Sequence, residues 1–302
     1  MTGVAVGRVI LRGPVMTAAG TSGTGTELAA FGNLNELGAV VVKSLAPYPW
    51  DGNPAPRLVG IPGGMLNAVG LAGPGIPNWI ERDLPLLERE GATVVASVWG
   101  RSVDEYGAAA DLLAPVSARI AAIEVNLSCP NLSTGHGDVH EMFAHDPDVS
   151  AEVIRRMSAA SAPLWAKLSP NTDRLVEVAR AVAAAGADAV TLINTVRGRV
   201  LHPLTGAPVL GVGNGGMSGR TIQPVALRAV AEVRAALPRL AIVGAGGVVD
   251  GDSALAMLHA GADAVQVGTA TFADPRSPWR IQRDLCQALR GHPIATRERN
   301  RD

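Results

Sequence analysis

Cysteine is nearly absent from this chain: only Cys129 and Cys286 occur among its 302 residues. Two cysteines are too few for an iron–sulfur cluster or a zinc site held by four of them. A disulfide is not expected, because the first residues show no charged segment followed by a long apolar one and so no sign of export. We therefore expect a protein of the reducing cytoplasm, without a bound metal.

Aromatic residues and net charge are also scarce. Phe, Trp and Tyr make up 3% of the chain and the net charge is −1, which leaves few platforms for stacking bases and no basic surface for a nucleic acid. No apolar run approaches the roughly 18 residues of a membrane-spanning helix. The chain does have 47% apolar residues over 302 positions, which suits the large core of one α/β barrel.

Short apolar runs alternate with amphipathic ones along the chain. Each short run is rich in β-branched residues and apolar on both faces, which is typical of strands buried in a parallel sheet. The eight runs lie at 14–18, 39–44, 93–98, 122–127, 164–169, 189–194, 240–245 and 264–269. Eight strands separated by helices predict a (β/α)8 barrel, formed by residues 1–302 as a single domain.

Three other segments complete the predicted fold. Helices are predicted over 79–91 and 173–186, because both amphipathic runs end at a glycine. The alternating residues from Val4 to Leu11 predict a small hairpin at the bottom of the barrel. The stretch from Val196 to Gly219 is predicted to be irregular, and loops of that length in compact domains are usually functional.

Glycine-rich turns follow the last two predicted strands. Gly246-Gly247 and Gly268-Thr269 stand where barrels of this fold usually bind phosphate, because small residues let backbone N–H groups approach the phosphate oxygens. The alternative is a pair of tight turns without a ligand. The stretch Gly211–Gly216 fits G-x-G-x-x-G, but no strand directly precedes it, so we do not expect a dinucleotide fold there.

Two lysines, Lys43 and Lys167, each end a predicted strand. An ammonium group in a packed barrel is unfavourable unless an anion or acceptor meets it. Either each lysine pairs with a carboxylate, for which Glu124 is the candidate by pattern, or both face a phosphate-bearing cofactor. A flavin fits the second hypothesis, because its reduced form carries negative charge that a fixed ammonium stabilises.

Cys129 lies just after the fourth predicted strand, where a thiol beside cations could act as a general base. The alternative is a small buried apolar residue, which is the better description of Cys286 in its predicted helix. Side-chain amides gather near the same rim, at Asn67, Asn126, Asn131 and Asn194. Amides both donate and accept, which suits a substrate rich in imide groups, although turn chemistry could explain any one of them.

Several motifs resemble those of one family. The stretches that carry the resemblance are "VNLSCPN", "KLSPN", "LINT", "GGMSG…PVALR", "VGAGGV", "AVQVGTA" and "GNPAPR". Together they resemble class 1 dihydroorotate dehydrogenases over about residues 5–275, and "MLNAVGLAGPG" at 65–75 is similar to the class 1B version. The resemblance implies an FMN enzyme that oxidises dihydroorotate to orotate in pyrimidine biosynthesis, with Cys129 as the base for the C5 proton.

The resemblance also implies the residues of the site. Cys129 and Lys43 would be catalytic. The substrate would be held by Lys43, Asn67, Ala68, Val69, Gly70, Leu71, Asn126, Asn131, Asn194 and Thr195. FMN would be held by Ala19, Lys43, Ser44, Ser97, Asn126, Lys167, Ile193, Gly219, Gly246, Gly247, Gly268 and Thr269.

The class 1B resemblance implies an electron-transfer subunit with FAD and an iron–sulfur cluster that passes electrons to NAD, in a heterotetramer; a homodimer is the other assembly we expect. The chain departs from the family near the predicted mouth: Ala19–Gly25 lacks both phenylalanines of the usual first loop, and Ala72-Gly73 replaces Gln-Asn. Two further hypotheses stay open. One is a related FMN enzyme acting on another cyclic imide or pyrimidine-like substrate, and the other is a non-catalytic phosphate-binding barrel.

Overall fold

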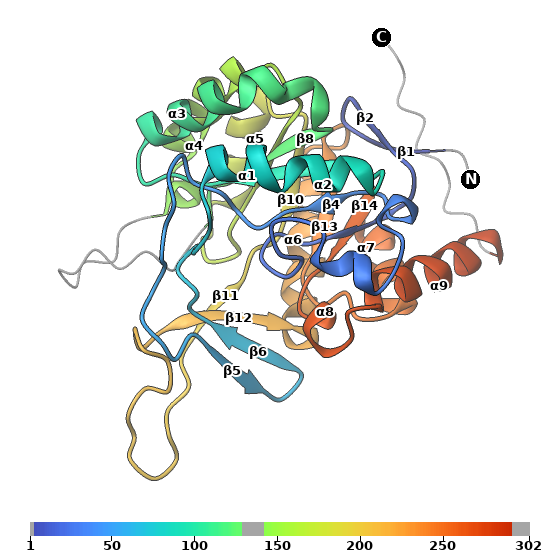
Figure 1. The fold of residues 1–302 in the computed structure, drawn as a ribbon. Coiled ribbons are helices and arrows are strands. Elements are labelled where there is room, and N and C mark those ends of the chain that lie inside the picture. Colours follow the sequence, from blue (N-terminus) through green and yellow to red (C-terminus); the bar gives the residue numbers. More distant parts are fainter. Residues whose placement is uncertain (1–2, 129–141, 292–302) are drawn as a thin grey trace.

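The chain folds as a (β/α)8 barrel, which we describe from a computed structural model covering residues 3–128 and 142–291 (Figure 1). Eight strands form one parallel sheet in the order β3 (Val15–Thr17), β14 (Ala264–Val267), β13 (Ala241–Ala245), β10 (Ala189–Leu192), β9 (Leu164–Lys167), β8 (Ala122–Asn126), β7 (Val94–Val98) and β4 (Val40–Val41). A parallel bridge between Met16 and Ala39 joins the two edges. All eight predicted strands are thus confirmed.

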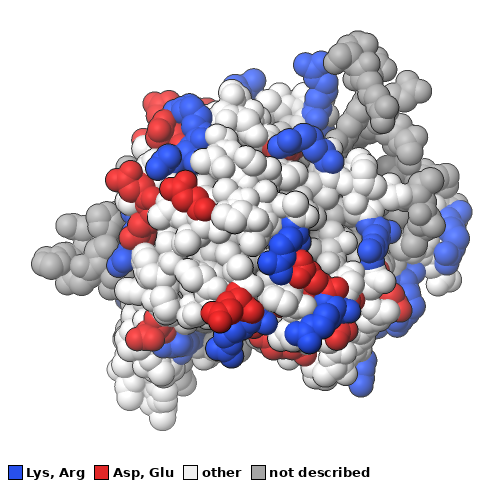
Figure 2. Space-filling model, turned by 45° about the horizontal axis from the view of Figure 1, so that its top comes forward, with Lys and Arg blue, Asp and Glu red and all other residues white. Residues whose placement is uncertain are grey.

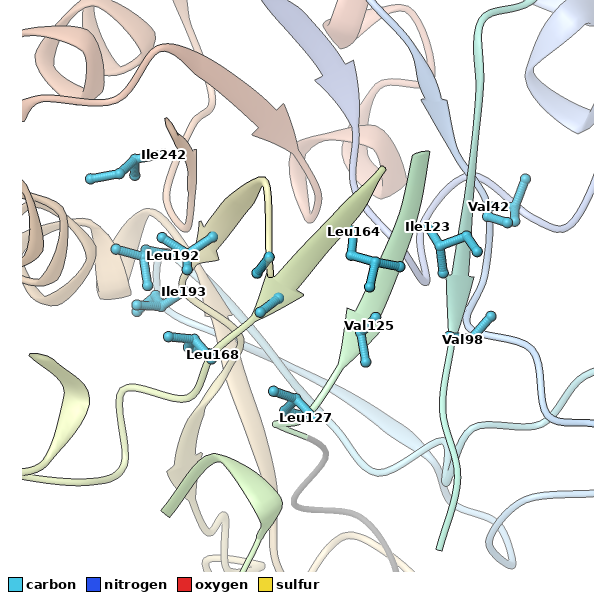
Figure 3. Close-up of a cluster of buried hydrophobic side chains, with 14 of the residues drawn as sticks. Val42, Val98, Ile123, Val125, Leu127, Leu164, Leu168, Leu192, Ile193 and Ile242 are labelled. Atoms are coloured by element: carbon cyan, nitrogen blue, oxygen red, sulfur yellow. The ribbon is translucent and has the colours of Figure 1, made fainter. Parts of the chain in front are cut away.

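Helices surround the barrel. They are α1 (Ile76–Arg82), α2 (Leu84–Arg89), α3 (Val103–Leu113), α4 (Pro147–Met157), α5 (Leu175–Ala184), α6 (Gln223–Ala236), α7 (Gly251–Ala260), α8 (Ala270–Ala273) and α9 (Ser277–Gly291). Short 3-10 helices lie at Glu27–Ala30, Leu34–Glu36, Ala114–Arg119, Phe143–His145, Ser158–Ala160 and Arg220–Ile222. Apolar side chains between the strands and the helices form the main core. Figure 3 shows part of it, with Ile123 of β8 beside Leu164 of β9.

The predicted helix over 79–91 is wrong in detail. The structure has two shorter helices, α1 and α2, which meet at Asp83. Pro85 lies in the first turn of α2 and has no backbone N–H, so a continuous helix would lose a hydrogen bond there. The other predicted helix is confirmed as α5, which stops just before Gly186.

The hairpin near the N-terminus is confirmed. Strands β1 (Val4–Val6) and β2 (Val9–Leu11) pair antiparallel. Their buried residues Val6 and Leu11 pack against barrel residues at the amino ends of the strands, among them Ala122 and Ala189. The hairpin therefore closes the bottom of the barrel, which leaves the carboxyl ends of the strands as the open side.

The segment from Val196 to Gly219 is not irregular throughout, so that prediction is wrong at both ends. It begins as β11 (Val196–Gly198) and ends as β12 (Gly215–Gly219). Both join β6 (Gly64–Asn67) and β5 (Leu58–Ile61) in an antiparallel sheet of order β11-β12-β6-β5, which lies to one side of the barrel (Figure 1). Gly216 of β12 lies close to the side chain of Thr195. An added Cβ atom at Gly216 would lie 2.1 Å from Thr195 Oγ1, so only glycine fits at this position.

Charges of both signs are mixed on the surface. On the face in Figure 2, Lys and Arg side chains alternate with Asp and Glu. Exposed pairs such as Arg119–Glu88, at 2.7 Å, account for part of this pattern. Each such pair contributes only about 0–1 kcal/mol, so they matter more for solvation than for the fold. Among the described residues, no helix combines the length and the apolar character needed to cross a bilayer.

Candidate active site

A cavity opens at the carboxyl ends of the barrel strands, between the barrel and the β11-β12-β6-β5 sheet. Residues from the ends of β3, β4, β8, β9, β10, β13 and β14 line its inner side, and β6 and β12 supply its outer side. At its rim, Leu58 and Phe272 are 47% and 54% exposed. This is the side of the barrel where the fold places active sites.

Glycines form one wall of the cavity. Gly246 and Gly247 follow β13 with φ angles of 114° and 78°, which favour glycine. A Cβ atom at Gly247 would lie 2.4 Å from Cβ of Gln223, so the turn has no room for a larger residue. Ser218 Oγ lies 2.8 Å from Thr269 Oγ1 and links β12 to the turn after β14. Such a surface of exposed backbone suits a phosphate group.

Two cations and three amides face the same cavity. Lys43, Lys167, Asn67, Asn126 and Asn194 all line it. Asn126 is 6% exposed, and its Nδ2 donates to Ser44 Oγ at 3.3 Å, which in turn lies 2.8 Å from Ser97 Oγ. The amide group of Asn126 is therefore fixed in its orientation before any ligand binds.

The end of β8 is anchored by the same network. Ser128 donates from its N–H and its Oγ to Asn126 Oδ1, at 3.3 and 3.2 Å. Asn194 Nδ2 donates to the carbonyl and Oγ of Ser128, at 3.1 and 3.0 Å. Cys129 and Asn131 lie outside the described residues, but the residue before Cys129 is held at the cavity.

The segment from Asn67 to Leu71 forms a bent wall. Gly70 and Leu71 both have left-handed φ angles, 72° and 62°. Trp50 Nε1 donates to the carbonyl of Gly70 at 2.9 Å, and Leu71 packs with Trp50 and Trp99 behind the wall. A left-handed leucine is unfavourable on its own, so this packing must maintain it.

An aromatic and ionic cluster supports that wall from outside. The guanidinium of Arg101 lies 5.1 Å from the ring centre of Tyr48 and 5.0 Å from that of Trp50. Tyr48 donates to Glu105 Oε2 at 2.8 Å. Burial, and then this hydrogen bond, raise the pKa of Tyr48, so its hydroxyl stays a donor at neutral pH.

Lys167 has polar partners inside the barrel. Its Nζ lies 3.2 Å from Glu124 Oε1 and 3.2 Å from Gln266 Oε1. The first alternative expected for this lysine, pairing with Glu124, is confirmed, and Lys167 also lines the cavity.

Most residues of the expected site come together here. The cavity is lined by Ala19, Lys43, Ser44, Asn67, Val69, Gly70, Leu71, Asn126, Lys167, Ile193, Asn194, Thr195, Gly219, Gly246, Gly247, Gly268 and Thr269. Ala68 and Ser97 are fully buried beside this lining. Sequence reasoning missed Gln266 and Ser218, and also the apolar rim at Leu58, Met65 and Phe272. Of these, Gln266 had a signal, because it is a polar residue inside an apolar strand.

The fold and the site define a (β/α)8 barrel with a cavity that is lined by glycine turns, side-chain amides and ammonium groups. Comparison with known proteins narrows this class. A model of the dihydroorotate dehydrogenase family matches residues 1–289, and the chain belongs to that family.

Three similar proteins share the description "Dihydroorotate dehydrogenase B (NAD(+)), catalytic subunit". The protein from Geobacter sp. (strain M21) is 46% identical over 96% of this chain and 94% of its own length. The protein from Citrifermentans bemidjiense is 45% identical over the same shares. The protein from Geotalea uraniireducens is 42% identical over 97% of this chain and 94% of its own length. These relatives agree with the class 1B resemblance of the sequence motifs.

Proposed function

We propose that this chain is the catalytic subunit of a dihydroorotate dehydrogenase and oxidises dihydroorotate to orotate with bound FMN, in pyrimidine biosynthesis. The observation that carries the proposal is the buried ammonium of Lys167 at a cavity whose other walls are glycine turns and oriented amides. The family and the shared description of the relatives support the substrate. The whole chain works as one FMN-binding barrel.

The residues present fit FMN. The turns at Gly246-Gly247 and Gly268-Thr269 line the cavity after the last two barrel strands, where barrels of this fold usually bind phosphate. Ala19, Ser44, Ile193 and Gly219 line other parts of the same cavity, with Ser97 behind Ser44. When bound, FMN would supply the hydride acceptor. Lys43 and Lys167 would place positive charge where negative charge accumulates during the reaction.

The substrate gives up a hydride from C6 and a proton from C5, and the product gains a C5=C6 double bond. Cys129 is the group we assign to take the proton, following the motif "VNLSCPN". Asn67, Asn126, Asn131 and Asn194, with Thr195 and the wall from Ala68 to Leu71, would hold and orient the imide ring. Because amides donate and accept, they can match each N–H and C=O of such a ring.

Electrons then leave the chain through a partner. The relatives are described as catalytic subunits of an NAD(+) enzyme, which supports a second subunit. The class 1B resemblance implies that this subunit carries FAD and an iron–sulfur cluster. Exposed apolar side chains at the cavity rim, Leu58 and Phe272, suit contact with such a partner. We expect the assembly to be a heterotetramer. We expect it to lie in the cytoplasm, because a chain with only two cysteines suits a reducing compartment.

The direct test is to purify the chain, release its chromophore and follow bleaching of the flavin by dihydroorotate. We expect noncovalent FMN and reduction by dihydroorotate without NAD. A colourless protein that cannot be reconstituted with FMN would refute the flavin site. If dihydroorotate does not reduce the bound flavin but another cyclic imide does, the proposed substrate is wrong and the flavin site stands.

A further inference from the structure

A fully buried carboxylate stands inside the barrel, next to the cavity floor. Glu124 lies in the middle of β8 and is 0% exposed. Three side chains from three other strands donate to it: Lys167 at 3.2 Å, Thr191 at 3.0 Å and Gln266 at 2.5 Å. A buried carboxylate is tolerated only when it is paired and hydrogen-bonded in this way.

The network forms a closed triangle. Gln266 donates from Nε2 to Glu124 and accepts at Oε1 from Lys167 at 3.2 Å, while Lys167 also donates to Glu124. An ammonium has three donors, and within the described residues two of them are used here. Lys167 and Gln266 line the cavity, whereas Glu124 and Thr191 do not. Lys167 is therefore the charged group through which Glu124 can act on a ligand in the cavity.

A simple stabilising ion pair does not account for this arrangement. Replacing a buried pair by apolar residues is often neutral or stabilising, because desolvation offsets most of the attraction. The layer of barrel residues below the triangle is apolar, with Ala122, Ala189 and Val243 packed in one cluster. An apolar pair in place of Glu124 and Lys167 could extend that apolar cluster toward the cavity. The triangle instead puts one ammonium, with its counter-charge, at the cavity.

We propose that Glu124 is a positioning residue that sets, through Lys167, the relative affinity of the site for reduced and oxidised FMN. The inference rests on the proposed FMN site. The ammonium favours the negative charge of the reduced flavin, and the carboxylate 3.2 Å behind it opposes that field from a greater distance. Glu124 thus holds the ammonium in place and also limits its effect on the flavin.

The two roles separate in two substitutions. Glu124→Gln keeps an oxygen that accepts from Lys167 but removes the opposing charge, so reduced FMN should gain affinity relative to oxidised FMN. Glu124→Asp keeps the charge but retracts the carboxylate by one methylene, so the ammonium is drawn from the cavity and the relative affinity should fall. We expect about a tenfold change in each direction, or roughly 30 mV for a two-electron couple.

The measurement is titration of apoprotein with oxidised and with reduced FMN, together with the midpoint potential of the bound flavin. Each substitution is made alone and in a Lys167→Met background, where the shift caused by Glu124→Asp, which acts by moving the ammonium, should vanish. Thr191→Val, which removes a donor to Glu124 without changing charge, is the matched control and should shift the potential much less.

Each outcome is decisive. Opposite shifts, with the Glu124→Asp shift lost in the Lys167→Met background, support the proposal. Unchanged relative affinities, or a Glu124→Asp shift that persists without Lys167, would overturn it. If only Glu124→Gln fails to fold, Glu124→Asp carries the test because the charge is retained; if both fail, Glu124 serves stability and the proposal is wrong. A wild-type protein that does not bind FMN would refute the proposed function itself.

Discussion

The chain has two cysteines, of which the structure describes Cys286, and together they allow a paired experiment. Cys286 lies in α9 and is 5% exposed, and burial raises the pKa of its thiol, so it stays protonated at neutral pH. Cys129 lies outside the described residues, but Ser128 before it is held by Asn126 and Asn194 at the cavity. We therefore take Cys129, the base expected from the sequence motif, as the target and Cys286 as its control.

We expect Cys129→Ala to slow reduction of the flavin by dihydroorotate by about 10²–10⁴-fold, because the C5 proton loses its base. Cys129→Ser should lose activity as well, since a hydroxyl is far less acidic than a thiol. Stopped-flow absorbance of the flavin measures the rate, and retained FMN shows that the site is intact. Cys286→Ala is the matched control and should react at the wild-type rate. Wild-type reduction in Cys129→Ala would identify another base.

The turn at Gly247 offers a second test at the scale of one residue. Gly247→Ala should weaken FMN binding at least about tenfold, because a methyl group would meet Gln223 at 2.4 Å and a left-handed alanine costs about 1–2 kcal/mol. Gly206→Ala is the control: its φ is also left-handed, at 68°, but nothing lies within 4 Å of the added atom. Titration with FMN compares the two variants, and equal affinities for FMN in both would contradict a phosphate site at Gly247.

Some site residues could be predicted from the sequence and others could not. Lys167 and the glycines stand at strand ends, where the fold places function. Glu124 and Gln266 carry a weaker signal, a polar residue within an apolar strand. Their hydrogen bond joins residues 142 positions apart, which no local pattern encodes. For that reason, the sequence offers Glu124 as a possible partner of a lysine but does not predict the triangle.

At the scale of elements, secondary structure was predictable where local composition decides it. The barrel strands are apolar and β-branched on both faces, so each is visible alone. Strand β12 reads Gly-Gly-Met-Ser-Gly, a composition that disfavours strands. It forms because glycine lets it pair closely with β6, about 150 positions away, and a Cβ atom at Gly215 would lie 2.6 Å from the carbonyl oxygen of Asn67. Long-range packing, absent from local sequence, decides this element.

Helix α7 starts directly after the glycine wall, and its cap is a separate target. Asp250 accepts from the N–H of Ser253 at 2.8 Å, and Ser253 returns a bond by accepting from the N–H of Asp250 at 3.0 Å. Partial burial alone would raise the pKa of Asp250, but the hydrogen bonds from Ser253 and the guanidinium of Arg220 outweigh it and lower the pKa. A carboxylate with a lowered pKa stabilises the fold while it is ionised.

We expect Asp250→Ala to reduce the free energy of unfolding by about 0.5–2 kcal/mol at neutral pH. The difference from wild type should be constant above about pH 3.9, the ordinary value for aspartate. It should shrink as the pH falls through the lowered pKa of Asp250, because the wild type then loses the same interaction. Urea unfolding over a pH series measures it. Asp250→Asn keeps a good cap and should cost less; an equal loss would contradict the capping role.

At the scale of the whole molecule, the order of eight strands and the closure of the barrel followed from the number and spacing of apolar runs. The side on which ligands bind followed from chain direction, because parallel strands put all their carboxyl ends at one edge. The second sheet, which forms the outer side of the cavity, could not be predicted from the apolar runs. The cavity therefore owes its inner side to a predictable barrel and its outer side to long-range pairing of β6 and β12.

Electrons taken from the substrate must pass from this chain to an acceptor. Two cysteines cannot hold an iron–sulfur cluster, and the G-x-G-x-x-G stretch ends within β12 instead of opening a helix after a strand. The chain alone therefore has neither a relay nor a site of the usual kind for NAD. We expect the isolated protein to oxidise dihydroorotate with an artificial dye but not with NAD, and to gain NAD reduction only when a subunit with FAD and an iron–sulfur cluster is added.

Parallel steady-state assays with NAD, fumarate, a quinone and a dye measure this. Fast NAD reduction by the lone chain would refute the partner, preference for fumarate would indicate a different electron acceptor, and no turnover with any acceptor would point to another cyclic substrate.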